Sequence, residues 1–370
     1  MIPTNERINT IDGLRCVAIL SVVLYHYCYR FSPPAVGVNY YPYQFESSIV
    51  KYGYYGVELF FVISGFVIFQ TLGRTKKMSE FIVNRLIRLL PSLAICAIVT
   101  YLVVAVLDTS QFFSFLHSRT WMNFIPSLSF IPPGFWNRLL HRTDIGYIDG
   151  SYWSLFAEVV FYCFGGFLFF LQPKRFLSNW LRLTLLMILI RIITSPKNQT
   201  LFPDFLNSVF AVVYQGYFAL NINYWVYFAL GVFFYSLHLS RRASIADLAM
   251  VLAMTSLELY FLGDNVLRIL FLGIIALFVT LVYKERWLTF LKFKVFIRIG
   301  LVSYPLYLLH ANVGLVLIHR LGSIPVHPGY YKYLPLIVLV WMIVLAGIIY
   351  QFYEKPIISF LRTRLVARVK

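Results

Sequence analysis

The first long apolar run of the chain contains two ionisable side chains, Arg15 and His26, eleven residues apart. In an α-helix, eleven residues make about three turns, so both side chains lie on one face, about 16 Å apart along the axis. An imidazole takes up a proton near neutral pH or carries a transferred group, and a guanidinium suits phosphate. The spacing therefore predicts an acid–base site and an anion site on one helix. The alternative is an arginine that extends to the membrane surface and a histidine satisfied inside a helix bundle.

Three more ionisable residues interrupt apolar runs further along the chain: Glu58, Glu158 and His310. Ionisable groups inside a membrane are costly and are usually functional. Two carboxylates and two imidazoles at similar depth would have shifted pKa values, a usual mark of acid–base catalysis. We therefore predict that these three residues form a catalytic centre with His26, and chance convergence is the alternative. Ser64, in the same run as Glu58, is a weaker candidate for binding substrate or for packing at a close helix contact.

A second group of ionisable residues is cationic and lies at the opposite ends of these runs. Arg85 and Arg88 are three residues apart and share one helix face, and we place Arg15 and Arg298 at the same level. Arginine binds phosphate through two parallel hydrogen bonds, so this layer predicts a site for a phosphate-bearing substrate. The alternative is that these arginines only mark the cytoplasmic side of the membrane.

The elements that carry these residues are long apolar runs, and the composition is that of a membrane protein. Of the 370 residues, 60% are hydrophobic and 13% are charged, whereas soluble domains carry about 25% charged residues. A helix needs about 20 apolar residues to cross a bilayer. We predict an all-α membrane protein, a bundle of about ten transmembrane helices, over residues 13–30, 54–73, 87–107, 152–172, 178–195, 224–239, 244–262, 266–283, 297–319 and 333–354.

The net charge of +17 comes from short clusters of Lys and Arg between these runs. Cytoplasmic loops carry such clusters, so topology explains the charge, and nucleic-acid binding has no support. The same rule predicts that both termini lie inside the cell. The cysteines and histidines show no metal-ligand spacing, so no metal site is expected. We predict one domain over residues 1–370, with a short cytoplasmic tail at 357–370 and a further short or re-entrant helix within 201–222.

The longest outer segment, residues 108–150, is rich in aromatic, proline and basic residues. We predict interfacial helices and turns there, and we predict that Trp136 and Arg138 bind an acceptor substrate. Sugars are held by aromatic faces together with charged and polar side chains, which this segment also offers in Trp121, His141 and Asp149. The alternative is that its aromatic residues only anchor the protein at the membrane surface.

Taken in order, these motifs resemble those of the acyltransferase-3 family of membrane acyltransferases. The run from Arg7 to Arg15, continuing to His26, is similar to the opening of that family, with its Arg-x10-His motif. Further matches follow in the run 62–66, in Arg85 with Arg88, in Trp153 with Glu158, and in Ser303 with His310. The chain departs from the family pattern at Asn84, where many members have a further arginine, and we expect it to lack the hydrolase-like domain fused to some relatives.

The resemblance implies transfer of an acyl group, above all acetyl, from acetyl-CoA or another acyl-CoA. The acceptor would be a hydroxyl of a carbohydrate or glycolipid, such as lipopolysaccharide or another envelope or exported polysaccharide, and the protein would lie among the lipids of the bacterial inner membrane. The arginines would hold the coenzyme's phosphates, and His26 would act as general base or carry the acyl group. Glu58 or Glu158 would orient His26 and stabilise its imidazolium. The alternatives are acylation of a small molecule or antibiotic, and a transporter that uses the buried charges as its pathway.

Overall fold

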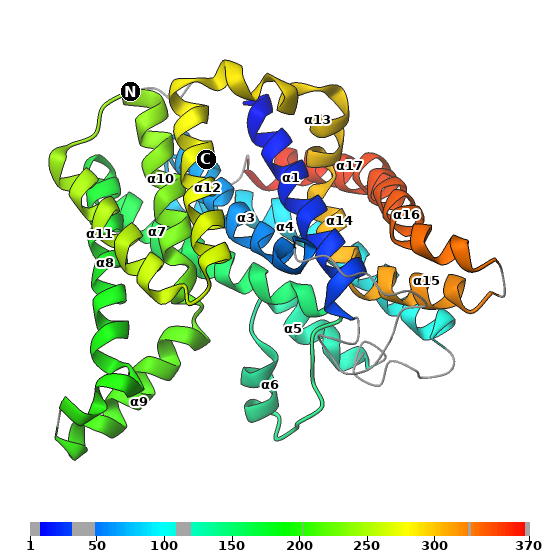
Figure 1. Cartoon of the computed structure of the whole chain (residues 1–370), viewed down its shortest axis with the longest axis horizontal. Helices are drawn as coiled ribbons and strands as arrows, with labels where there is room; N and C mark the ends of the chain where they lie inside the picture. Colours follow the sequence, from blue (N-terminus) through cyan, green and yellow to red (C-terminus); the bar gives the residue numbers. More distant parts are fainter. Residues whose placement is uncertain (1–7, 32–48, 109–119, 202, 325–326, 367–370) are drawn as a thin grey trace. The chain divides into compact units, whose positions relative to one another are not determined.

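The computed structural model describes residues 8–31, 49–108, 120–201, 203–324 and 327–366 (Figure 1). Every regular element within these ranges is a helix, which confirms the predicted all-α class. Eight of these helices are long and apolar enough to cross a bilayer, so the chain is an integral membrane protein. The chain divides into two compact units, each assembled from separate segments of the sequence.

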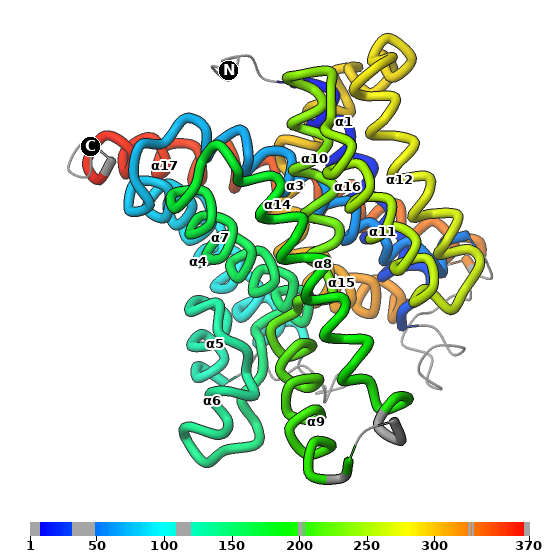
Figure 2. The backbone as a smooth tube through the Cα atoms, turned by 90° about the vertical axis from the view of Figure 1, so that its left-hand side faces the viewer, coloured from blue at the N-terminus to red at the C-terminus, as the bar shows by residue number. Residues whose placement is uncertain are grey.

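The first unit contains Glu58–Phe81 and Phe156–Thr289. Its helices are α3 (Gly56–Leu72, from Glu58 onward), α7 (Trp153–Leu171, from Phe156 onward), α8 (Phe176–Thr194), α9 (Asp204–Ala219), α10 (Trp225–Ser240), α11 (Ile245–Phe261) and α12 (Asn265–Tyr283). Helix α10 is buried along most of its length and contacts α8, α11 and α12 (Figure 2). Helix α9 occupies the stretch for which the sequence predicts an additional helix.

Two glycines let α3 and α10 approach each other closely within this unit. A Cβ atom on Gly65 would lie 2.2 Å from the backbone oxygen of Phe228, and one on Gly231 would lie 2.1 Å from that of Val62. Any larger side chain would therefore push two backbones apart. Gly65 directly follows Ser64, so this contact also fixes where the serine hydroxyl lies.

The second unit contains Ile8–Val57, Ile82–Leu155 and Phe290–Lys370. Its main helices are α1 (Asn9–Tyr25), the π-helical turn η1 (His26–Arg30), α4 (Met78–Leu107, from Ile82 onward), α5 (Phe124–Ser129), α6 (Pro133–Leu139), α13 (Lys294–Leu301), α14 (Ser303–Leu309), α15 (Asn312–Gly322), α16 (Leu334–Ile349), the π-helical turn η11 (Tyr350–Glu354) and α17 (Lys355–Leu361). Helix α1 contacts α13 and α14 along its length (Figure 1). The beginning of α1 lies directly on α13, because Gly300 has no side chain to separate it from the backbone of Asp12.

The predicted ninth span, residues 297–319, is not a single helix. The structure divides it into α13, α14 and α15, with turns between them. At the second turn, the backbone N–H of Asn312 donates to Oδ2 of Asp149 at 2.8 Å, and the side-chain amide of Asn312 donates to the carbonyl of Ile148 at 2.8 Å. Because these bonds replace part of the helical ladder, α15 begins as a new helix.

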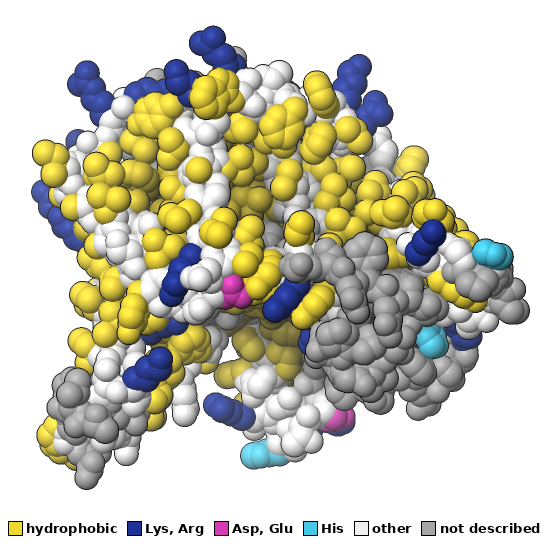
Figure 3. Space-filling view, in the orientation of Figure 1, with side chains coloured by type: hydrophobic (Ala, Val, Ile, Leu, Met, Phe, Trp, Pro, Cys, Tyr) yellow, Lys and Arg dark blue, Asp and Glu magenta, His cyan; other side chains and the backbone are white. Residues whose placement is uncertain are grey.

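Hydrophobic side chains dominate the visible face over α12, and Lys and Arg side chains gather where this helix ends and the 3-10 helix η9 (Glu285–Lys292) begins (Figure 3). This is the pattern of a membrane helix followed by a basic loop. The orientation with both termini inside the cell stays a prediction.

Candidate active site

The end of α1 brings His26 against His310 within the second unit. Nδ1 of His26 lies 3.3 Å from Nε2 of His310, and the rings meet edge to face with centroids 4.7 Å apart. Nδ1 of His26 also lies 2.9 Å from the backbone oxygen of Val22, and Nδ1 of His310 lies 2.7 Å from that of Tyr307. Two of the four residues predicted to form the catalytic centre are therefore in contact.

The two carbonyl contacts decide which nitrogens carry protons when both rings are neutral. A carbonyl oxygen only accepts, so Nδ1 of His310 donates to Tyr307 and its Nε2 holds a lone pair. Nδ1 of His26 faces two acceptors, this lone pair and the carbonyl of Val22, so we assign its proton there. The lone pair of His26 is then on Nε2, which makes Nε2 the atom able to take a proton from a substrate hydroxyl.

Both histidines lie where a regular α-helix stops. His26 begins the π-helical turn η1, and its backbone N–H contacts the carbonyls of both Val22 and Val23. π-helical turns are rare in proteins, and those that occur are often found at functional sites. His310 is fully buried at the turn between α14 and α15. Helix α1 is regular from Arg15 to its end, so the separation of about 16 Å between the arginine and His26 is retained.

Asp149 is fully buried, so it is not the exposed sugar contact that the sequence suggests. Its Oδ1 accepts hydrogen bonds from the backbone and hydroxyl of Ser151, at 2.8 and 2.7 Å, and its Oδ2 accepts from the backbone of Asn312. Burial raises the pKa of Asp149, and the hydrogen bonds from Asn312 and Ser151 and the nearby His26 oppose that rise. Asp149 is thus a carboxyl group within electrostatic reach of His26.

The two predicted catalytic glutamates belong to the first unit. Oε1 of Glu158 accepts from the hydroxyl of Ser64 at 2.5 Å and from the hydroxyl of Tyr162. Glu58 is buried, and its Oε2 has no hydrogen-bond partner in the described part of the chain. Ser64 therefore contacts a predicted catalytic carboxylate. That Glu58 and Glu158 meet the histidine pair, and that Ser64 binds substrate, stay predictions.

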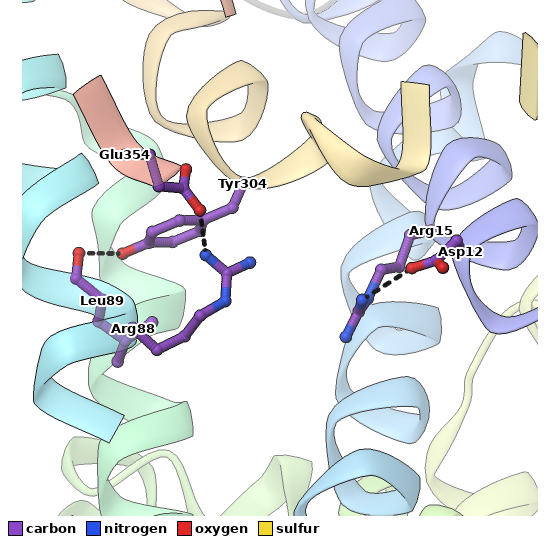
Figure 4. A network of polar contacts seen from close by, with 6 residues as sticks. All are labelled: Asp12, Arg15, Arg88, Leu89, Tyr304 and Glu354. Atoms are coloured by element: carbon purple, nitrogen blue, oxygen red, sulfur yellow. Dashed lines mark hydrogen bonds and ion pairs between the residues drawn. The ribbon is translucent and has the colours of Figure 1, made fainter. Parts of the chain in front are cut away.

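In the predicted phosphate layer, Arg88 is held by Glu354 and Tyr304, which were not among the predicted site residues. Its Nη1 lies 2.6 Å from Oε1 of Glu354, which is buried in the turn η11. Its guanidinium also lies over the ring of Tyr304, 5.1 Å from the centroid (Figure 4). The Tyr304 hydroxyl donates to the carbonyl of Leu89 at 3.1 Å, so the ring itself is fixed. Arg88 therefore has a defined position before any ligand binds.

Arg15 and Arg298 lie on the two helices that pack together at the start of α1. Nη1 of Arg15 lies 3.1 Å from Oδ1 of Asp12, and Arg298 is exposed in the last turn of α13. In Figure 4 the side chains of Arg15 and Arg88 extend from their helices toward the same space. That Arg15, Arg88 and Arg298 serve one site stays a prediction.

A further arginine joins the pair on α4. Arg362, which follows α17, lies within electrostatic reach of both Arg85 and Arg88. In the sequence, Arg362 falls in the predicted cytoplasmic tail, where topology alone would explain its charge. Three like charges this close favour an anion that bridges them.

Residues 120–150 of the predicted outer segment contain the short helices α5 and α6, and 109–119 lie outside the described residues. The indole nitrogen of Trp136 donates to the hydroxyl of Ser129 at 3.2 Å, so this side chain already joins two parts of the segment. Arg138 is exposed. Their role in acceptor binding stays a prediction.

Glu258 was not among the predicted site residues, although its sequence position carries a signal. It is a carboxylate inside the predicted span 244–262, and Tyr227 donates to it at 2.9 Å in the interior of the first unit. Asp149 lies in the predicted outer segment and Glu354 at the end of a predicted span, where an ionisable residue is unremarkable, so their roles had no such signal. Among the described residues, no three His, Cys, Asp or Glu side chains are grouped as a metal site would require.

Fold and site together define a multi-helical membrane protein in which the end of α1 brings His26 into contact with His310, and an earlier turn of the same helix carries Arg15. Residues 8–353 match the Acyl_transf_3 acyltransferase domain, and the chain belongs to this acyltransferase-3 family. It is 24% identical over 377 aligned positions to the O-acetyltransferase OatA of Staphylococcus aureus strains NCTC 8325 / PS 47 and COL, over 94% of this chain and 56% of each relative. The chain thus spans little more than half the length of these relatives. No solved structure matches it.

Proposed function

We propose that this protein is a membrane O-acetyltransferase that moves an acyl group, above all acetyl, from acyl-coenzyme A to a carbohydrate hydroxyl at the bacterial inner membrane. The family and the similarity to O-acetyltransferase OatA support the reaction type. The observation that carries the proposal is the contact between His26 and His310, because it leaves the basic nitrogen of His26 on Nε2.

In the proposed reaction, Nε2 of His26 takes the proton of the acceptor hydroxyl as its oxygen attacks the thioester carbonyl carbon. The carbon–sulfur bond then breaks, and the imidazolium returns the proton to the departing coenzyme A thiolate, so the histidine ends as it began. Arg85, Arg88 and Arg362 would bind the coenzyme's phosphates, with Arg15 and Arg298 beside them. The span of about 16 Å along α1 suits the slender arm that joins those phosphates to the thioester.

The test is transfer by the purified protein in lipid nanodiscs with radiolabelled acetyl-CoA. Envelope glycans extracted from cells that lack the gene serve as acceptor, and mass spectrometry locates the added acetyl group. We expect acetylated glycan with the wild-type protein and none with His26→Ala. If the label accumulates on a small molecule, the acceptor is that molecule and not a carbohydrate. Absence of any donor turnover would contradict the proposal.

A further inference from the structure

Asp149 joins two segments that are far apart in the sequence. Its Oδ1 accepts from Ser151 at the start of a helical turn, and its Oδ2 accepts from the first backbone N–H of α15, that of Asn312. The side chain of Asn312 returns a hydrogen bond to the carbonyl of Ile148 at 2.8 Å. One fully buried carboxylate therefore caps two helical segments at once and binds them to each other.

The turn that Asp149 stabilises is the one that carries His310. Asn312 follows His310 by two residues, and the preceding helix, α14, is tied to the same segment by Tyr307. The Tyr307 hydroxyl donates to the carbonyl of Ser151 at 3.0 Å and lies 2.8 Å from the hydroxyl of Ser154. Because the carbonyl of Tyr307 holds Nδ1 of His310, this network sets both the place and the tautomer of that ring.

Within the described part of the chain, the backbone and hydroxyl of Ser151 and the backbone of Asn312 all donate to the oxygens of Asp149, so its carboxyl group acts as a hydrogen-bond acceptor. Among the described residues, His310, Asp149 and Arg30 act on His26 through their charge, and Asp149 is the negative one of these three. A negative charge near an imidazole favours the protonated ring. When His26 takes a proton during the reaction, Asp149 is placed to stabilise the product of that step.

We infer that Asp149 is the positioning carboxylate of the histidine pair: it fixes His310 through Asn312 and stabilises the imidazolium of His26. The inference rests on the proposed function. It assigns to Asp149 the role that the sequence analysis gave to Glu58 or Glu158. Both oxygens of Asp149 are engaged by Ser151 and Asn312, so it acts through the histidines and is a positioning residue.

The test compares Asp149→Asn with Asp264→Asn. Asp264 is a matched control because it caps α12 by accepting from the backbone of Val266 at 2.8 Å, in the unit without the histidine pair. We expect Asp149→Asn to lower kcat by 10- to 100-fold with coenzyme A binding unchanged, and Asp264→Asn to match wild type. Without the negative charge, protonation of His26 becomes less favourable, so the acid limb of the pH–rate profile should move to lower pH. A wild-type kcat and pH profile in Asp149→Asn would overturn the inference.

A second variant covers the case in which Asp149→Asn does not fold. Asn312→Ala keeps the backbone bond to Asp149 but removes the bond to Ile148, so it should fold and still lower kcat. Histidine ¹⁵N shifts provide a readout that does not need transfer: they should show Nδ1 of His310 protonated in wild type and a mixture of tautomers in the variant. Wild-type kcat and shifts in Asn312→Ala would overturn the inference, whereas ordered histidines with no transfer in the wild-type protein would contradict only the proposed function.

Discussion

The hydrogen bonds around His26 form a chain with one direction. The carbonyl of Tyr307 accepts from His310, whose Nε2 accepts from Nδ1 of His26. The basic nitrogen of His26 is therefore the end of the chain, available to a substrate proton. His310 supplies what a carboxylate supplies in many histidine-dependent acyl transfers, namely a fixed tautomer for the base.

The role of His26 can be tested with a side chain that keeps hydrogen bonding but has no basic nitrogen. We expect His26→Gln to lower kcat by about 10²–10⁴-fold, the usual contribution of a general base. Coenzyme A affinity should not change, because the arginines lie about 16 Å away along α1. The control is His319→Gln in α15, a half-buried histidine outside the pair, which should keep wild-type turnover. Near-normal release of coenzyme A by His26→Gln would remove His26 from the mechanism.

Arg88 needs a different design because it pairs with a buried carboxylate. Removing Arg88 alone would leave Glu354 buried without a partner and destabilise the fold. We therefore compare the double variant Arg88→Ala/Glu354→Gln with the single variant Glu354→Gln, so that no buried carboxylate is left without its partner. A charge-assisted hydrogen bond to phosphate is worth about 1.5–3 kcal/mol, so coenzyme A should bind roughly 10- to 100-fold more weakly. Calorimetry measures the affinity for coenzyme A. The control is Arg175→Ala, a substitution of an exposed arginine in the first unit. Equal affinities would exclude Arg88 from the donor site.

Sequence spacing could relate Arg15 to His26 because both lie on one helix. It could not pair His26 with His310, or Arg88 with Glu354, since these partners are 284 and 266 residues apart. Such contacts follow from the packing of helices, and a single sequence carries no record of it. Asp149 shows the limit most clearly: its type and place suggested a surface residue, and its burial gives it a structural role.

At the scale of elements, helix positions were predictable and helix interruptions were not. Apolar runs located the long helices, because each must cover about 20 residues to cross a bilayer. The turn between α14 and α15 lies inside such a run, so hydropathy does not reveal it. The π-helical turn at His26 is hidden as well, because it continues α1 without a proline or glycine and hydropathy does not distinguish a π-helical turn from an α-helical one. Both interruptions carry a histidine of the pair.

The contact between α1 and α13 depends on a glycine, which gives a prediction for this pair of helices. A Cβ atom at Gly300 would lie 1.9 Å from the backbone oxygen of Asp12. We expect Gly300→Ala to destabilise the protein by about 1–3 kcal/mol, as overpacking does, and to weaken coenzyme A binding because Arg15 moves with α1. The control is Gly347→Ala in α16, where no atom lies within 4 Å of the added carbon. It should be neutral or stabilising by about 0.5–1 kcal/mol. A thermal midpoint in detergent that is unchanged by Gly300→Ala would contradict this packing.

For the whole molecule, one ion pair constrains how the chain crosses the membrane. The contact between Arg88 and Glu354 puts the first part of α4 and the turn η11, which follows α16, on the same side of the membrane. The chain must therefore cross the membrane an even number of times between these two residues. Four of the eight apolar helices lie wholly between these residues, and the rest of α4 and α16 itself bring the number of crossings to six. The two remaining predicted spans are α11 and the segment α13–α15. Because six is already even, either both of them cross the membrane or neither does.

The path of α13 and α14 decides between these possibilities. Gly300 lies against Asp12 near the start of α1, and His310 lies against His26 at its end. The segment therefore runs beside α1 in the same direction, and α1 is one of the eight apolar helices. If α1 crosses, this segment crosses with it, and the even count then requires α11 to cross as well.

This conclusion predicts opposite labelling on the two sides of α11. The helix has 17 residues, about 25 Å of rise, and a bilayer thins locally to accept a helix shorter than its core. We replace the four natural cysteines with alanine and introduce Ala243→Cys or Gly263→Cys, both at exposed positions that flank α11. The basic pair before Ala243 predicts the cytoplasmic side. An impermeant maleimide should therefore label Gly263→Cys in intact cells and Ala243→Cys only after permeabilisation. Labelling of both from one side would mean that α11 does not cross, and the arrangement of ten spans with both termini inside would be wrong.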